Sequence, residues 1–456
     1  MDRLITRHTY IFYSIVFFLH IINVFLNNDT LQYGIGLLTF PILYISFIRA
    51  TRLFKILGSI FMIVGMGLFL YSGSAFYEIP LNMTSTLSLL AFLTVLPWMN
   101  SAVRAGRYDR RINQLMKANS QTLDKFYMRS SLTTYILTIF VNLSALSLSQ
   151  TVLIENMKNI PKKLRDSFIS RTTLRAFALA IAWSPMEIMV AITVDATGVS
   201  YLTYLPWLFL CSVIVFSLDL FWGKRTFQGI EYQSSIKTKT RILAPRQIGM
   251  QILKLLVALA IFLMSVVTIS NQFDLNFTLT VTLVILPFTI AWSILMKRWR
   301  SFFAIGWATW KMRTNGLQNF VVLFLTLAFF TSSLNGTTFL EPIQQPFLAA
   351  ADNPILILLL IQFTYLGMSM IGVHPVATIA VLAEVLLPLY VVVNPLSIGI
   401  VLITGALATA TVGTYGVTVT MTSMNTQQNP YQITLRNMPF ALLYGGVGTT
   451  LAFLLL

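Results

Sequence analysis

The sequence predicts an all-α, polytopic membrane protein of about eleven transmembrane helices, with two re-entrant hairpins that enter from opposite faces. Three observations lead to this fold class. Only 10% of the 456 residues are charged and 56% are hydrophobic, whereas soluble proteins carry about 25% charged residues. Apolar runs of roughly 18 or more residues, long enough to cross a bilayer, recur along the chain. Between them the Lys and Arg residues gather in clusters, as they do in cytoplasmic loops.

The charge distribution predicts the orientation. The net charge is +16, with 31 Lys and Arg residues against 15 Asp and Glu, and every basic cluster can be placed on the cytoplasmic side. We attribute the charge to the positive-inside bias and to contact with anionic membrane lipids, not to nucleic-acid binding. The N-terminus, with Arg3 and Arg7, is therefore expected in the cytoplasm of a multi-pass protein of the cytoplasmic membrane.

Four predicted spans come first. Their apolar runs lie at about 10–26, 31–48, 54–71 and 81–98. The first run lacks a small-residue cleavage site, so it is predicted to be a retained helix and not a signal peptide. Ser101–Ser130 mixes charged and apolar residues, which is typical of a segment lying in the membrane interface.

The run Leu132–Ile154 cannot be a simple span. Seven basic residues precede it and six follow it, so both of its ends are expected on the cytoplasmic side. Its middle is polar and includes Asn142, Ser144 and Gln150. A re-entrant hairpin with its tip buried in protein satisfies both observations. The alternative is an ordinary span followed by a basic loop on the outer side.

A broken span and a closing span complete the first half. Leu174–Thr197 is apolar but is interrupted at Ser184–Pro185. The run at about 204–222 then returns to the basic loop Lys224–Arg246. This loop is the natural boundary between two halves, 1–235 and 236–456.

The second half repeats the plan from the opposite face. Spans are expected at about 251–269, 277–295 and 317–333, separated by the basic loop Lys297–Arg313, and 336–351 suits a short outer interfacial helix. Asn353–Leu387, broken by Gly372, His374 and Pro375, is the second hairpin, entered from outside. Spans at about 396–421 and 438–456 follow, which places the C-terminus outside. Such inverted repeats with broken helices are typical of secondary transporters.

Polar residues at membrane depth are the candidate site. Thr404–Pro430 is rich in Thr and Gly, so this helix can unwind and offer carbonyl and hydroxyl oxygens to a cation, or helix N-termini to an anion. The alternative is that its small residues only allow close helix packing. The candidate substrate-binding residues are Asn142, Ser144, Ser184, Pro185, His374, Thr378, Thr411 and Thr414, and the coupling-ion candidates are Glu187, Asn142, Thr409 and Gly413.

Few titratable groups lie within the spans. Glu187 follows the break at Ser184–Pro185 and could carry a proton or bind a coupling ion, or it could only form a structural hydrogen bond. Glu384 is the other clear intramembrane carboxylate, although it lies near the outer end of the second hairpin, and Asp195 and Asp219 lie nearer the span ends. His374, just before Pro375, could titrate near neutral pH or contact an anionic substrate. A helix–helix hydrogen bond is the alternative role for His374.

Other function classes lack their signatures. With three His and one Cys, the chain offers no close spacing of metal ligands, so neither a metal site nor a covalent cofactor is expected. It has no Walker loop and no soluble domain large enough for an ATPase. No convincing constellation of acid, base and nucleophile is found, so the protein is not expected to be an enzyme.

The order of elements resembles the ion transporter superfamily, which includes divalent anion–sodium symporters, arsenite-efflux-type permeases and citrate–metal carriers. The resemblance covers nearly the whole chain and indicates a divergent member. It implies that hairpin tips and interrupted helices hold substrate and sodium, that the protein is a homodimer, and that transport is of the elevator type. The segments that match the family's hairpin tips and following turns are Asn142–Ser144, His374–Thr378, Ala182–Pro185 and Thr411–Thr414.

The leading hypothesis is therefore a secondary active transporter for a small, anionic organic solute, coupled to H+ or Na+. The main alternative is a transporter or flippase for an envelope lipid or a lipid-linked precursor, since the chain is rich in aromatic and Met residues. A channel is a third possibility, disfavoured because opposed hairpins suggest alternating occlusion. The sequence does not identify the substrate, the coupling ion or the direction of transport.

Overall fold

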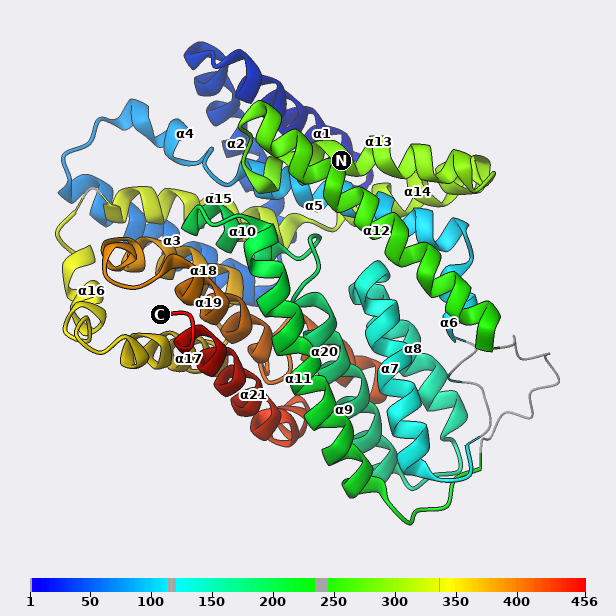
Figure 1. Cartoon of the computed structure of the whole chain (residues 1–456). Coiled ribbons are helices and arrows are strands. Elements are labelled where there is room, and N and C mark those ends of the chain that lie inside the picture. Colours follow the sequence, from blue (N-terminus) through cyan, green and yellow to red (C-terminus); the bar gives the residue numbers. More distant parts are fainter. Residues whose placement is uncertain (1, 114–115, 117–119, 234–244, 336) are drawn as a thin grey trace. The chain divides into compact units, whose positions relative to one another are not determined.

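A computed structural model describes all residues except 1, 114–115, 117–119, 234–244 and 336 (Figure 1). The described chain is helical, in agreement with the predicted fold class. Eight of its helices are long and apolar enough to cross a membrane. They are His8–Leu26, Asp29–Arg49, Arg52–Ser72, Phe76–Ala105, Tyr201–Phe227, Gly249–Phe273, Phe277–Leu295 and Gln318–Asn335.

Three predicted spans are absent from that set. Two of them, Leu174–Thr197 and about 396–421, are interrupted helices whose continuous pieces are too short or too charged to count as spans. The third is the C-terminal helix α21 (Pro430–Phe453), which carries Arg436, Asn437 and several Gly and Thr residues. Eight of the roughly eleven predicted spans are thus continuous helices long and apolar enough to cross a membrane. The other three predicted spans are not tested by the structure.

The chain forms two compact units, each drawn from three separate segments of the sequence. Unit 1 contains Met1–Ala102, Val266–Ala351 and Ile379–Leu389, and unit 2 contains Val103–Ser265, Asp352–Thr378 and Tyr390–Leu456. These units divide the chain by internal contacts, whereas the predicted repeats divide it by sequence order. The predicted boundary at 235/236 lies outside the described residues.

Unit 1 is built around helices that touch through small residues. In α3 (Arg52–Tyr71), a Cβ on Gly58 would lie 2.6 Å from Val322 Cγ1, and one on Gly65 would lie 3.1 Å from Phe329 Cδ1. Both partners belong to α15 (Gln318–Asn335), so glycines let these two helices approach closely. The other elements lying wholly in unit 1 are α1 (Asp2–Leu26), α2 (Asp29–Arg49), η1 (Phe76–Glu78), α4 (Ile79–Asn82), α13 (Phe277–Leu295), α14 (Trp299–Asn315) and α16 (Leu340–Leu348).

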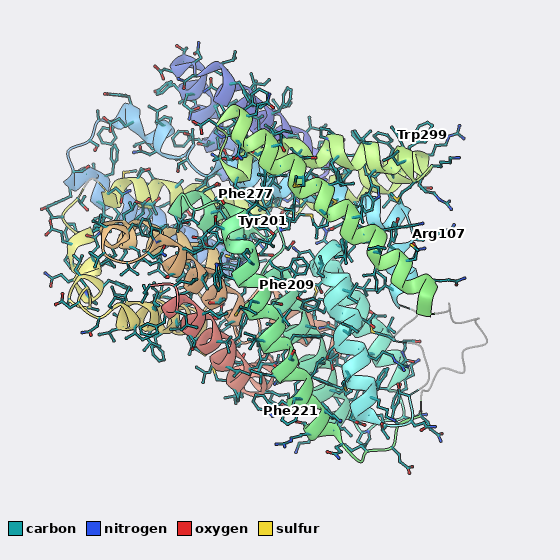
Figure 2. All side chains as sticks on the ribbon, viewed as in Figure 1. Arg107, Tyr201, Phe209, Phe221, Phe277 and Trp299 are labelled. Carbon is teal, nitrogen blue, oxygen red and sulfur yellow. The ribbon has the colours of Figure 1, made fainter. Side chains whose placement is uncertain are left out.

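Helix α14 corrects the prediction of a plain basic loop at Lys297–Arg313. Phe302 is fully buried, and a Cβ on Gly306 would lie 2.4 Å from the Trp98 ring, so this face packs on unit 1. Trp299, the first residue of α14 (labelled in Figure 2), and Trp307 are half exposed. The cluster of basic residues suggested a loop, but the same segment also has an apolar helical face. Clustered charge indicates a loop only when no such face accompanies it.

Unit 2 carries both hairpins' tips and both broken helices. The first hairpin is α7 (Leu123–Val141) packed on α8 (Leu143–Asn156). It is longer than the predicted Leu132–Ile154, because the first eight residues of α7 (123–130) fall within the predicted interfacial segment. Among its other described residues, the interfacial segment contains the short helix α6 (Tyr108–Asn113). The segment predicted as the second hairpin contains α17 (Pro354–Met370) and α18 (Pro375–Leu386), separated by a break at Gly372. α17 packs on α19 and α21, and α18 continues from unit 2 into unit 1, so the hairpin form of this segment stays a prediction.

The broken helices are α9 (Lys162–Ile181) with α10 (Ile188–Thr197), and α19 (Pro395–Thr409) with α20 (Val417–Thr426). Their interruptions lie where the sequence predicts them. The remaining helices of unit 2 are α11 (Tyr201–Phe227) and α21. Besides α18, three elements cross unit borders: α5 (Leu87–Ala105), α12 (Pro245–Phe273) and η3 (Leu387–Val391).

Long helices expose large apolar side chains. On α11, Phe209 and Phe221 are half exposed (Figure 2), and on α3, Ile63 is 72% exposed. Lipid is the solvent that such surfaces require in helices of this length. These faces and the eight candidate spans identify a multi-pass membrane protein.

Gly223 on α11 provides a test of packing in unit 2. A Cβ there would lie 2.0 Å from Cε1 of the fully buried Tyr127. We expect Gly223→Ala to destabilise the protein by about 1–3 kcal/mol, the usual cost of overpacking, and to lower the midpoint of thermal unfolding in detergent. Gly446→Ala on α21, where nothing lies within 4 Å, is the control. Equal midpoints for the two variants would contradict the tight contact at Tyr127.

Candidate functional site

The break between α9 and α10 is held by side chains from neighbouring helices. Ser184 N donates to Ile181 O (3.0 Å) and Glu187 N donates to Ser184 O (3.2 Å), which turns the chain around Pro185. Trp183 Nε1 donates to Tyr135 Oη (2.7 Å) on α7. The Trp183 carbonyl accepts from Tyr201 Oη (2.6 Å) on α11. A carbonyl in an interrupted helix needs such a partner, so the break is a defined structure.

The tip of the first hairpin meets this break. Asn142 joins α7 to α8 with φ 43°, a left-handed value that Asn tolerates better than most residues. Its side chain lies in hydrogen-bonding range of the Glu187 carboxylate, as do the backbone N–H groups of Ile188 and Met189 at the start of α10. Two coupling-ion candidates, 45 positions apart in the chain (187 − 142), are thus neighbours.

Glu187 forms no salt bridge within the part of the chain that the structure describes. It is 8% exposed, and no ion pair includes it among the described residues. An ionised carboxylate in the interior costs several kcal/mol unless a charge compensates it. The amide and N–H donors offset part of that cost. A proton or a bound cation would supply the remaining compensation.

The second hairpin meets the other break in the same way. A Cβ on Gly413, in the break between α19 and α20, would lie 2.8 Å from Ser369 Oγ on α17. Gly372, at the hairpin tip with φ 92°, faces the ring of Tyr415 at 3.1 Å from a built Cβ. The positive φ favours glycine at position 372, and at position 413 a Cβ would collide with the Ser369 side chain. Each hairpin tip is therefore paired with one helix break.

The hydroxyls of this second break are mostly used locally. Thr409 Oγ1 donates to Ala406 O (2.6 Å) and Thr411 Oγ1 to Ala408 O (2.8 Å). Thr414 bonds Thr434 of α21 (3.0 Å). Such back-bonding satisfies the unwound turn. In the described structure these threonines form no hydrogen bond with Asn142 or Glu187, so the predicted set is brought together as two groups.

His374 and its neighbours begin α18. His374 Nδ1 accepts from Val376 N (3.2 Å), so the ring caps the helix that Pro375 starts. Thr378 is buried one turn later, and its N–H donates to His374 O (3.3 Å). Ser144 lies in the first turn of α8 and is partly exposed. These contacts give His374 a structural role at the tip and leave ligand contact by these three residues a prediction.

Gln150 joins the first hairpin to the far broken helix. Its Nε2 donates to Thr422 Oγ1 (2.8 Å) on α20 and to Thr173 Oγ1 (3.2 Å) on α9. Its Oε1 accepts from Asn425 Nδ2 (2.8 Å). Gln150 is fully buried. The Gln150 amide thus connects α8, α9 and α20. The sequence alone identified Gln150 only as a polar residue in the middle of Leu132–Ile154.

A buried ion pair joins α9 to α11, between the basic start of α9 and its break. Arg175 Nη1 donates to Asp219 Oδ1 of α11 (2.8 Å), and Arg175 Nε donates to Asn437 Oδ1 of α21 (3.0 Å). Tyr127 Oη of α7 donates to Asp219 Oδ2 (2.8 Å). Trp222 and Phe440 cover the guanidinium, at 5.4 and 5.1 Å from their ring centroids. Four helices of unit 2 are joined by this network.

Sequence reasoning assigned no role to Arg175, Tyr127 or Asn437. The signal for one partner was available, because Asp219 is an acid inside an apolar run and such acids are paired. The sequence did not identify the partners themselves, because Arg175 lies 44 residues from Asp219 and Asn437 lies 262 residues from Arg175.

Comparison with known proteins shows a transporter-like fold. No family model and no curated protein matches this chain. Among solved structures, the YdaH transporter of Alcanivorax borkumensis is similar, with a TM-score of 0.60 and 12% sequence identity over 87% of this chain and 98% of that one. At this identity the similarity concerns the fold alone.

Proposed function

We propose that this protein is a secondary active transporter of the cytoplasmic membrane for a small, anionic organic solute. The observation that carries the proposal is the meeting of the Asn142 tip with the α9–α10 break at Glu187, a buried carboxylate with no cationic partner among the described residues. Broken helices at membrane depth are the usual location of substrate and coupling-ion sites in secondary transporters. The fold similarity to a transporter supports the same class.

The anionic preference rests on helix ends. At the two tips and the two breaks, α8, α18, α10 and α20 begin at Leu143, Pro375, Ile188 and Val417. Helix N-termini carry partial positive charge and free N–H groups, which favour anions. A solute carboxylate placed there would be held by Ser184, Thr414 and backbone amides.

Coupling would pass through Glu187. A proton or Na+ bound beside Asn142 neutralises the carboxylate, so the loaded site can cross the membrane at lower cost than the empty, charged one. Both tips and both breaks belong to unit 2, which supports an elevator mechanism in which the unit that carries the site moves as one body. We further propose a homodimer with the N-terminus in the cytoplasm and the C-terminus outside.

The test is uptake into proteoliposomes. Small carboxylates would first be screened by thermal shift, and stabilising solutes then offered as labelled compounds under an inward Na+ or H+ gradient. Concentrative uptake that an ionophore abolishes is expected. Uptake that ignores both gradients would refute secondary transport. Transfer of a fluorescent phospholipid between leaflets, with no solute uptake, would replace this proposal by the lipid alternative.

A further inference from the structure

Arg171 on α9 forms no salt bridge with any residue that the structure describes. It is half buried, and its Nε is fully buried with no hydrogen-bond partner in the described chain. No carboxylate of the described residues lies within salt-bridge distance of it. A guanidinium stays charged at any physiological pH, so leaving it buried and unpaired costs several kcal/mol.

Arg436 on α21 faces the same region. Its Nη1 donates to Gln428 Oε1 (2.8 Å) and Ser170 Oγ (3.1 Å), both neutral groups. It is also half buried and forms no ion pair with a described residue. Arg171 and Arg436 act on each other electrostatically, and both are within range of Arg175. Three guanidinium groups therefore share one small volume.

The nearby carboxylates are committed or more distant. Asp219 accepts from Arg175 and from Tyr127, both at 2.8 Å. Asp166 lies 3.8 Å from Arg165 and beyond salt-bridge distance of Arg436. The preceding residues Lys162 and Lys163 add further positive charge. Asp219 acts electrostatically on Arg171, and Asp166 acts on Arg436. These two carboxylates face three guanidinium groups, so positive charge remains in excess among the described residues of this region.

We propose that Arg171 and Arg436 bind a phosphate-type oxyanion. Two guanidinium forks from different helices suit a tetrahedral anion, because each can donate two parallel N–H bonds to its oxygens. Ser170 and Gln428 hold the Arg436 fork in place. The anion would come either from solution or from a lipid headgroup, since both present the same phosphate oxygens.

This site is separate from the hairpin tips. Tyr127, which bonds Asp219, lies in the arginine cluster, whereas Asn142 lies at the tip of the same helix. Fifteen residues separate them (142 − 127), which is roughly 22 Å at about 1.5 Å per residue. The proposal therefore stands whether or not the transport function does.

Thermal unfolding of the purified full chain in detergent tests the site with inorganic phosphate. At constant ionic strength, with chloride exchanged for phosphate, we expect a saturable rise in the unfolding midpoint. Arg171→Gln and Arg436→Gln should weaken phosphate binding at least tenfold. Lys163→Gln, the same charge change at an exposed position of α9, should bind as wild type. If a Gln variant fails to fold, Arg171→Lys keeps the charge, loses the fork and should still bind more weakly.

A second arm separates the two sources. The same proteins are placed in nanodiscs of phosphatidylcholine with or without phosphatidylglycerol. Stabilisation by phosphatidylglycerol that needs both arginines assigns the site to a lipid headgroup, whereas stabilisation by free phosphate alone assigns it to a soluble anion. The proposal is overturned if neither probe gives a saturable effect, or if Lys163→Gln loses as much as the two arginine variants.

Discussion

Replacing Arg175 by Met is expected to destabilise the protein by about 3–5 kcal/mol, the cost of breaking a buried ion pair from one side. Arg175 is 2% exposed and Asp219 is 1% exposed, so Asp219 would keep the Tyr127 hydrogen bond but would have neither a countercharge nor water. Asn437 would also lose the donor to its Oδ1. Unfolding in detergent, followed by circular dichroism against denaturant, measures the loss.

The matched control is the double variant Arg175→Met with Asp219→Leu. Removing both charges leaves no unpaired ion, and apolar replacements of a buried pair are often close to neutral. We therefore expect the double variant to be more stable than the single one, with a clear coupling energy between the two positions. If the double variant were as unstable as the sum of both single variants, the ion pair would not be the cause.

Replacing Glu187 by Gln is expected to reduce gradient-driven uptake at least tenfold while leaving the fold intact. Gln is nearly the same size and can still bond Asn142, but it cannot carry a proton or balance a cation. Its uptake should no longer respond to the coupling gradient. Solute uptake in proteoliposomes, with and without an ionophore, reports both changes.

Glu384→Gln is the control for that experiment. Glu384 is the other clear carboxylate predicted at membrane depth, and it belongs to unit 1, whereas Asn142 and Glu187 belong to unit 2. Its change should leave the response to the gradient intact. An unaltered gradient response in Glu187→Gln would remove Glu187 from the coupling role and return it to a structural one.

The positions of the basic clusters predicted the turn of the first hairpin from the sequence alone. Two basic clusters flank Leu132–Ile154, and the structure has a helix, the Asn142 turn and a second helix there. The interruptions at Ser184–Pro185 and in Thr404–Pro430 were equally predictable, because Pro, Gly and Thr weaken a helix locally. The start of α7 and the existence of α14 were not, since dense basic charge obscured their helical period.

The sequence by itself determined the class of protein, the expected side of each loop and the positions of the turns, because insertion and helix breaking depend on local composition. Only the tertiary structure decided which polar groups meet. Asn142 reaches Glu187, and Gln150 reaches Asn425 across 275 residues. Such partners are chosen by helix packing, and local composition carries no record of which distant segment packs where.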